Sequence, residues 1–224
     1  GVSAQQLIPD WAILDDELTI GLPAAVTAAT GIDAMVHAIE AYTSKHNKNP
    51  VSDCLAREAL SLLGANIRTA CTQPEDRAAR GAMLLGSMLA GMAFANAPVA
   101  AVHALAYPLG GHFHVPHGLS NAMVLPYVLE FNAPDASAAY AEIAPILFPE
   151  LAGQSADAKV AGMIAAFKAL GPELGMDPKL SSVGVNHNHL PMLAEDAMKQ
   201  TRLLVNNPRE MTLEAAQAIY EKAL

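Results

Sequence analysis

The sequence predicts an all-α fold, and three observations support this prediction. Apolar residues recur at a helical period through most of the 224 residues. Helix start signals, in which a capping side chain precedes proline or an acidic residue, come before several of these apolar runs. Strand signals are confined to the residues before Leu22. With 52% hydrophobic and 16% charged residues, the chain is long enough to bury a large core.

The first element expected is a short strand followed by a turn. Leu7, Ile8, Trp11 and Ile13 supply apolar side chains, and the pair Asp15–Asp16 closes the segment. Paired carboxylates in a turn are typical of solvated charge, so we assign them no chemistry.

Helices are expected from Pro23 onward. Pro23 stands at a helix start, and the apolar face that follows reaches about Tyr42, with an interruption expected at Gly31. Asn49 followed by Pro50 predicts the cap and first turn of the next helix. The expected helices cover residues 23–42, 50–69, 77–97, 99–107, 117–131, 135–148, 155–170 and 190–205, and a last one opens at residue 212.

Composition excludes some classes of partner. A net charge of -9 and a pI near 5.2 argue against nucleic acid and against an anionic membrane surface. The longest proline-free part of the charge-free segment, residues 81–97, has 17 residues, fewer than the roughly 20 that a membrane span needs. Cys54 and Cys71 lack the spacing of a metal finger and are expected to be reduced core residues. Together with the absence of a signal-peptide pattern, they favour a cytoplasmic protein.

Residues 81–129 contain four histidines and two tyrosines but no Asp, Glu, Lys or Arg. Polar rings in apolar surroundings must find partners. His103 and His117 lie on either side of a proline and a Gly-Gly pair, so one helix and the start of the next can bring both rings to one point. The alternative is that both are core histidines with ordinary hydrogen bonds.

A carboxylate and another imidazole precede this segment. Asp33 and His37 lie one helical turn apart among apolar neighbours, and such a buried pair needs a cation or a proton between its members. One carboxylate and three imidazoles suit Fe(II) or Zn(II) and leave a position open for a substrate oxygen. A plain hydrogen bond on the helix surface is the alternative for this pair.

Three further polar residues belong to the same stretches. Glu40, one turn beyond His37, either orients the His37 imidazole or is solvated. His112 is expected to line the pocket, and His114 to take a supporting or structural role. Other catalytic patterns are missing, since the sequence has no GxSxG, HExxH, P-loop or GxGxxG motif.

The sequence resembles the iron-containing (group III) alcohol dehydrogenases, whose relatives include glycerol dehydrogenase, maleylacetate reductase and dehydroquinate synthase. The matching pieces are LPAAVTAATGIDAMVHAIEAY, MAFANAPVAAVHALAYPLGGHFHVPHGLSNAMVLP and NNPREMT. The resemblance implies the helical C-terminal domain of this dehydroquinate synthase-like fold. It also implies that Asp33, His37, His103 and His117 bind Fe(II), or in some members Zn(II).

The resemblance further implies a reaction with NAD or NADP on a small primary alcohol or aldehyde. The ion would hold the alcohol oxygen as an alkoxide, and the adjacent carbon would give hydride to nicotinamide. Phe94 matches a position at the nicotinamide end of the pocket. Tyr107 stands where some relatives have a second histidine, so we expect it to shape the pocket rather than to relay protons.

Family members also carry an N-terminal nucleotide-binding domain with a glycine-rich phosphate loop, which this sequence does not contain. Residues 1–22 are therefore expected to be a strand and linker remnant of the domain junction, and residues 23–224 the metal-binding catalytic domain. Alone, the chain is expected to bind metal without turnover, and the family suggests a homodimer. Two alternatives stay open: a maleylacetate reductase-like enzyme, with or without metal, and a non-catalytic helical binding domain that has lost its nucleotide-binding half.

Overall fold

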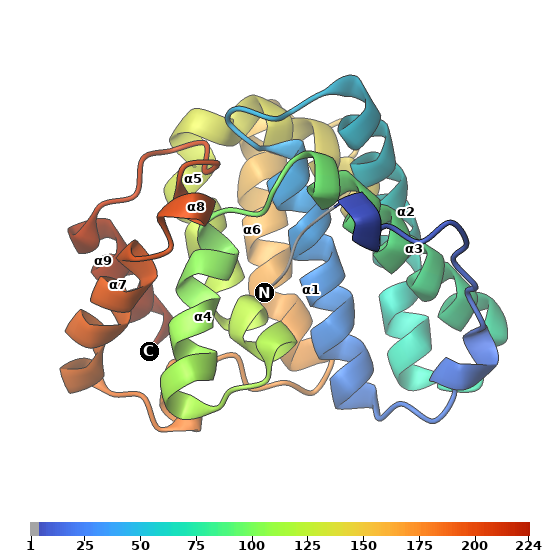
Figure 1. Ribbon diagram of the computed structural model, residues 1–224, viewed down its shortest axis with the longest axis horizontal. Coiled ribbons are helices and arrows are strands. Elements are labelled where there is room, and N and C mark those ends of the chain that lie inside the picture. The colour runs from blue at the N-terminus through green and yellow to red at the C-terminus, as the bar shows by residue number, and fades with distance from the viewer. Residues whose placement is uncertain (1–4) are drawn as a thin grey trace.

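The computed structural model describes residues 5–224, which fold into helices joined by short connections (Figure 1). The α-helices are α1 (Ala24–Tyr42), α2 (Pro50–Thr72), α3 (Arg77–Asn96), α4 (Ala101–Phe113), α5 (His117–Leu147), α6 (Ala156–Glu173), α7 (Leu190–Met198), α8 (Thr201–Leu204) and α9 (Leu213–Ala223). The 3-10 helices are η1 (Gln5–Leu7), η2 (Asp16–Thr19), η3 (Pro149–Leu151), η4 (Leu180–Val183) and η5 (His187–His189). No strand occurs within residues 5–224, and the predicted all-α fold is confirmed.

Helix α1 lies in the middle of the molecule and contacts helices on several sides (Figure 1). It packs against α2 and α3 on one side and α5 on another, while α4 packs against α5 and α7. Gly31 allows the close contact with α3, because a Cβ there would lie 2.7 Å from Met83 Cε. The interruption predicted at Gly31 is wrong, since this glycine serves packing inside a continuous helix.

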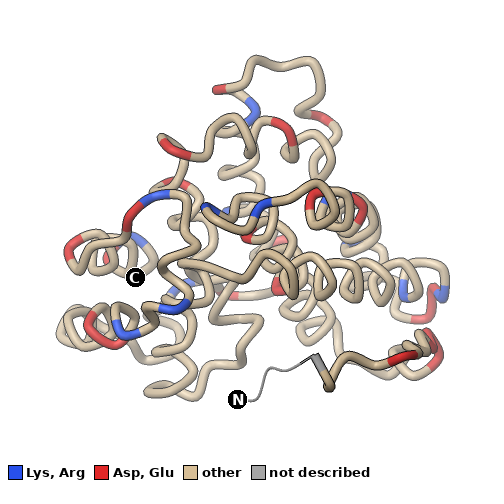
Figure 2. Tube along the Cα trace, turned by 45° about the horizontal axis from the view of Figure 1, so that its top comes forward, with Lys and Arg blue, Asp and Glu red and all other residues tan. Residues whose placement is uncertain are grey.

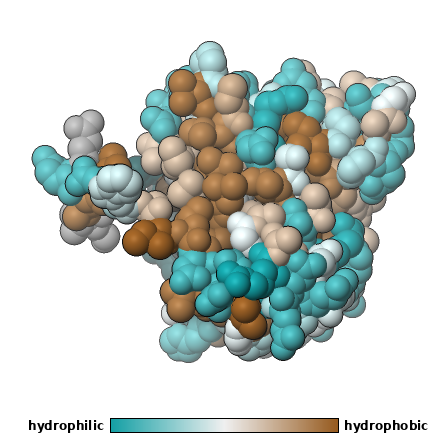
Figure 3. Space-filling model, turned by 90° about the vertical axis from the view of Figure 1, so that its right-hand side faces the viewer, coloured by the Kyte–Doolittle hydropathy of each residue, from teal (hydrophilic) through white to brown (hydrophobic). Residues whose placement is uncertain are grey.

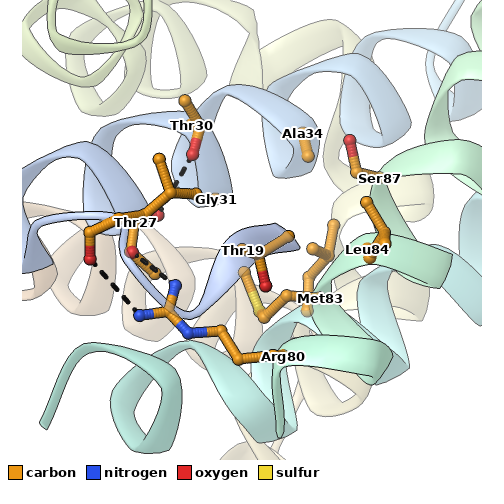
Figure 4. A pocket seen from close by; sticks show the side chains of 11 residues that line it. Thr19, Thr27, Thr30, Gly31, Ala34, Arg80, Met83, Leu84 and Ser87 are labelled. Carbon is orange, nitrogen blue, oxygen red and sulfur yellow. Dashed lines mark hydrogen bonds between the residues drawn. The ribbon is translucent and has the colours of Figure 1, made fainter. Parts of the chain in front are cut away.

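Arg80 joins the start of α3 to α1 and to the segment before α1 (Figure 4). It is 2% exposed, and its guanidinium donates to Thr27 Oγ1 at 2.8 Å, to Pro74 O at 2.9 Å and to Leu22 O at 3.4 Å. The small cavity beside Arg80 is lined by residues of η2, α1, α2 and α3, and Asp33 does not line it. Arg80 therefore has a structural role, separate from the predicted metal ligands.

The predicted N-terminal strand is wrong. The chain between η1 and η2 is irregular, and Trp11 and Ile13 are 88% and 91% exposed. A strand needs a neighbouring strand for its backbone hydrogen bonds, and residues 5–224 contain none.

Several predicted helix ends also differ from the structure. Helix α4 continues through Pro108 and the glycine pair to Phe113, and α5 is one helix of 31 residues where two were predicted. The predicted helix 190–205 is divided into α7 and α8. Helix α5 contains Pro134, and we attribute its continuity to packing against α1, α2, α4, α6 and α9, which outweighs the preference of proline for helix ends. Cys54, predicted to be in the core, is exposed, whereas Cys71 is buried.

Acidic and basic residues are interspersed over most of the chain, except in residues 81–129, which contain none (Figure 2). Within residues 5–224, α3 is the helix long and apolar enough to cross a membrane by length and composition, and 28% of its apolar window is buried. It packs against α2 and α1, and its outer face leaves Leu85 and Met92 exposed. Figure 3, which views the side on which α2 and α3 lie, shows apolar surface in the middle of this face.

Candidate metal centre

Helices α1, α4 and α5 bring the four predicted metal ligands together. Asp33 Oδ1 lies 3.6 Å from Nε2 of His103, 3.6 Å from Nε2 of His117 and 3.9 Å from Nε2 of His37. The ligand atoms of Asp33, His103 and His117 all lie within 4.8 Å of one another. Ligand atoms around a tetrahedral zinc ion are about 3.4 Å apart. The distances between the ligand atoms of Asp33, His103 and His117 are therefore close to those around a single bound ion.

His37 is the fourth member of the group. Its ring stacks on Phe94, with centroids 4.6 Å apart, and on His103, with centroids 4.7 Å apart. Stacking on both sides fixes the plane of the imidazole. His37 is therefore held beside the three closest ligands, with its Nε2 directed to the same carboxylate.

Glu40 orients His103, not His37. Its Oε2 lies 2.7 Å from Nδ1 of His103, and the carboxylate also accepts from the backbone N–H groups of Ala100 at 2.9 Å and Val102 at 2.7 Å. These N–H groups belong to the start of α4, where backbone donors lack helical partners. Glu40 therefore caps α4 and, by accepting from Nδ1–H, leaves Nε2 of His103 for a metal.

His117 is positioned by the contact between α5 and α1. It is the first residue of α5, directly after Pro116 at the N-cap. The next residue, Gly118, is so close to α1 that a Cβ would lie 2.4 Å from the carbonyl oxygen of Ala29. This close approach brings the start of α5, and with it His117, to Asp33.

Asn121 belongs to the site, and the sequence analysis missed it. Its Nδ2 donates to Asp33 Oδ1 at 2.5 Å and lies 3.3 Å from Nε2 of both His103 and His117. Its Oδ1 is buried without a partner within residues 5–224. The carboxylate oxygen and the two ring nitrogens thus converge on one point, which is the arrangement that a cation favours. The sequence signal was its position one turn after His117 on the same helix face.

Burial and charge shift the pKa values of the ligands in different directions. Burial lowers the pKa of His37 to about 4. Burial also acts to lower the pKa of His103, but the adjacent carboxylates of Asp33 and Glu40 outweigh it and raise that pKa to about 9. Burial acts to raise the pKa of Asp33, yet His103 and the other nearby imidazoles hold it below its usual value. A metal entering the site must therefore displace a proton from His103.

Of the other predicted site residues, Tyr107 lies beside this centre, whereas His112 and His114 lie at the C-terminal end of α4 and do not line the hollow at Asp33. Tyr107 is 40% exposed, and its ring centroid is 5.9 Å from that of His117. His112 lies at the exposed end of α4 and contacts Asp196 of α7. His114 is also exposed, and its left-handed backbone, with a φ of 54°, ends α4.

A hollow of about 490 Å³ adjoins the metal centre. It is lined by Asp33 and neighbouring residues of α1, by Pro116–Leu119 and by Gly175–Asp177. Its volume is within the range of small-molecule sites. The centre thus combines a candidate ion site with room for an organic ligand.

Comparison with known proteins decides the family. The C-terminal domain model of the Fe-containing alcohol dehydrogenase family matches residues 27–224. The chain belongs to this family. The resemblance stated from the sequence is therefore confirmed.

Two relatives and a solved structure give the extent of the likeness. Long-chain-alcohol dehydrogenase 1 of Geobacillus thermodenitrificans is 42% identical, over 99% of this chain and 56% of that protein. The 1,3-propanediol dehydrogenase of Klebsiella pneumoniae is 39% identical, over 96% of this chain and 55% of that protein. A crystal structure of 1,3-propanediol oxidoreductase has a TM-score of 0.89 and 39% identity, covering 94% of this chain and 55% of its own. The chain therefore spans about half the length of these relatives.

Proposed function

We propose that this chain is the metal-binding domain of an NAD(P)-dependent alcohol dehydrogenase that binds Fe(II), with Zn(II) as the alternative ion. The observation that carries the proposal is the convergence of Asp33 Oδ1 with Nε2 of His103 and His117, with His37 beside them. One carboxylate and three imidazoles form a donor set that both ions accept. The names of relatives, among them alcohol dehydrogenases and lactaldehyde reductase, support a small-molecule alcohol or aldehyde as substrate.

The residues of the chain have separate roles in this proposal. A divalent ion would polarise the substrate oxygen and make the hydroxyl easier to deprotonate. Asp33 balances part of the positive charge, and Glu40 keeps Nε2 of His103 directed to the centre. Phe94 packs on His37 at the edge of the site, where the resemblance implies that nicotinamide lies.

The proposal includes the partners of the chain. NAD or NADP would be held mainly by a nucleotide-binding domain, and the 224-residue chain alone would bind metal without turnover. We propose a cytoplasmic protein that forms homodimers and acts on small molecules rather than on nucleic acid or membranes. The net charge of -9 supports the exclusion of nucleic acid and of anionic membrane surfaces.

The test is to join this chain to the nucleotide-binding half of the Klebsiella 1,3-propanediol dehydrogenase and to load the hybrid with Fe(II) or Zn(II). We expect NADH formation from 1-propanol or 1,3-propanediol in the hybrid, none in the chain alone, and none in a hybrid carrying Asp33→Ala. A folded, metal-loaded hybrid without activity would favour the non-catalytic binding domain. Activity that persists without metal would favour the maleylacetate reductase-like alternative.

A further inference from the structure

We propose that Asn121 is a positioning residue of the metal centre. By donating to Asp33 Oδ1, it presents this one oxygen of the carboxylate to the ion and keeps the second oxygen from taking another ligand position. This inference rests on the proposed function, because the position that is kept free is the one for the substrate oxygen. It goes further by assigning a role to a residue outside the four predicted ligands.

A single oxygen of Asp33 faces the other ligands. Oδ1 lies 3.9 Å from Nε2 of His37, 3.6 Å from Nε2 of His103 and 3.6 Å from Nε2 of His117. A carboxylate that is free to turn about its last torsion can exchange its two oxygens or bind an ion through both. A second bound oxygen would fill the position that a substrate needs, so the orientation of Asp33 decides whether the centre stays open.

Asn121 fixes this orientation by a hydrogen bond. Its Nδ2 donates to Asp33 Oδ1 at 2.5 Å, whereas Nε2 of His103 and Nε2 of His117 lie farther away, both at 3.3 Å. The amide has to turn its NH₂ group to Asp33, because the reverse orientation would place two acceptor oxygens against each other. A carboxylate oxygen has two lone pairs, so Oδ1 can accept from Asn121 and still bind an ion.

Helices α1 and α5 hold the two side chains together. Asn121 follows His117 by one turn on α5, and Asp33 follows Ala29 by one turn on α1. One turn before the hydrogen bond, Gly118 lies so close to Ala29 that a Cβ there would be 2.4 Å from the Ala29 carbonyl oxygen. The close contact of the two helix backbones therefore sets the distance between Asn121 and Asp33.

Packing alone does not explain an asparagine at this position. Asn121 is 0% exposed, and its Oδ1 has no hydrogen-bond partner within residues 5–224. A buried polar atom without a partner does not recover the cost of its lost hydration, so an apolar side chain would suit the fold as well. The buried Asn132 on the same helix differs, since it donates to Asn207 at 3.0 Å and accepts from it at 2.7 Å. We therefore assign Asn121 to the carboxylate ligand and Asn132 to the stability of the fold.

The test compares Asn121→Leu with the matched control Asn132→Leu. Leucine keeps the branched shape of asparagine but can neither donate nor accept a hydrogen bond. Asn121→Leu should bind Zn(II) roughly 10- to 100-fold more weakly than the wild type, measured by competition with a coloured chelator, because loss of a group that orients a ligand has this effect. Asn132→Leu should keep the wild-type affinity. Asn121→Ala repeats the measurement with a side chain that is smaller than asparagine.

Urea unfolding of the metal-free variants separates positioning from a structural role. Asn132→Leu should lower the urea midpoint, because it leaves the buried Asn207 amide without its partner. Asn121→Leu should keep the wild-type midpoint, because it removes a buried oxygen that has no partner within residues 5–224. A structural role for Asn121 would lower the midpoint and the Zn(II) affinity together.

The visible spectrum of the Co(II)-loaded chain reports on the second oxygen of Asp33. Co(II) absorbs visible light more strongly with four ligands than with five or six. In Asn121→Leu the carboxylate is free to bind through both oxygens, so the absorbance per bound Co(II) should be lower than in the wild type. Azide, a small anion that probes the open position, should need a higher concentration to saturate its spectral change. Asn132→Leu should match the wild type in both respects.

Wild-type Zn(II) affinity in Asn121→Leu and Asn121→Ala, or a wild-type Co(II) spectrum and azide response in Asn121→Leu, would overturn this inference alone. A urea midpoint of Asn121→Leu as low as that of Asn132→Leu would also overturn it. A wild-type chain that binds neither Zn(II) nor Co(II) would overturn the proposed function together with the inference.

Discussion

Glu40→Gln tests how the metal centre is held in place. The Glu40 carboxylate is buried and accepts from the N–H groups of Ala100 and Val102 and from Nδ1 of His103, at 2.9, 2.7 and 2.7 Å. Glutamine has one acceptor oxygen and places an NH₂ group against the remaining donors. Because each hydrogen bond to a charged group contributes about 1.5–3 kcal/mol, the loss of one or two predicts a free energy of unfolding lower by about 2–5 kcal/mol.

Urea unfolding of the metal-free chain at neutral pH, followed by circular dichroism, measures this change. Glu58→Gln is the matched control, because Glu58 is exposed on α2, and its effect should stay within about 0.5 kcal/mol. Glu40→Gln should also weaken Zn(II) binding by about 10- to 100-fold, since His103 loses the group that orients it. Equal unfolding midpoints and equal Zn(II) affinities for the two variants would refute the role assigned to Glu40.

Three further predictions concern the same centre. Gly118→Ala puts a Cβ 2.4 Å from the Ala29 carbonyl oxygen and should lower the free energy of unfolding by about 1–3 kcal/mol. Gly111→Ala, the control, has open space around its Cβ and should not lower it. Equal urea midpoints for the two variants would contradict the close approach of α5 to α1. The pKa of His103 is raised from 6.5 to about 9, so its stabilisation of the metal-free chain is complete below pH 6.5 and is lost as the pH rises through 9. The urea midpoint should therefore fall between pH 7 and pH 10, and fall less in His103→Gln; parallel curves would argue against this shift. Because the same proton must leave when metal binds, calorimetry at pH 7 in buffers of different ionisation enthalpy should show about one proton released per Zn(II), and no buffer dependence would contradict this.

Local features of the site were predictable because helix periodicity defines them. Asp33 and His37 are one turn apart in the sequence, and the structure places both on α1 with their side chains 3.9 Å apart. Three-dimensional contacts were harder to predict. Glu40 was expected either to orient His37, its neighbour on the same helix, or to be solvated. It is buried and contacts His103, because the position of α4 depends on packing that periodicity does not describe.

The connection between His103 and His117 shows a similar limit. The sequence predicted that the proline and the glycine pair would end the helix, but α4 continues to Phe113 and the left-handed His114 ends it. Both histidines still reach Asp33, since the length of the connection allows it. For the segment around Trp11 the local pattern was misleading. Its apolar residues predicted a strand, but no partner strand exists among residues 5–224, and Trp11 is exposed.

The sharpest test of the site is the metal content of the chain and its variants, measured by mass spectrometry after loading with Fe(II) or Zn(II) and removal of free metal. We predict about one ion per chain for the wild type and for His114→Ala, which removes an exposed histidine of the same segment, and almost none for Asp33→Ala and His103→Ala. A full complement of metal in both ligand variants would contradict a shared ion at Asp33, His37, His103 and His117.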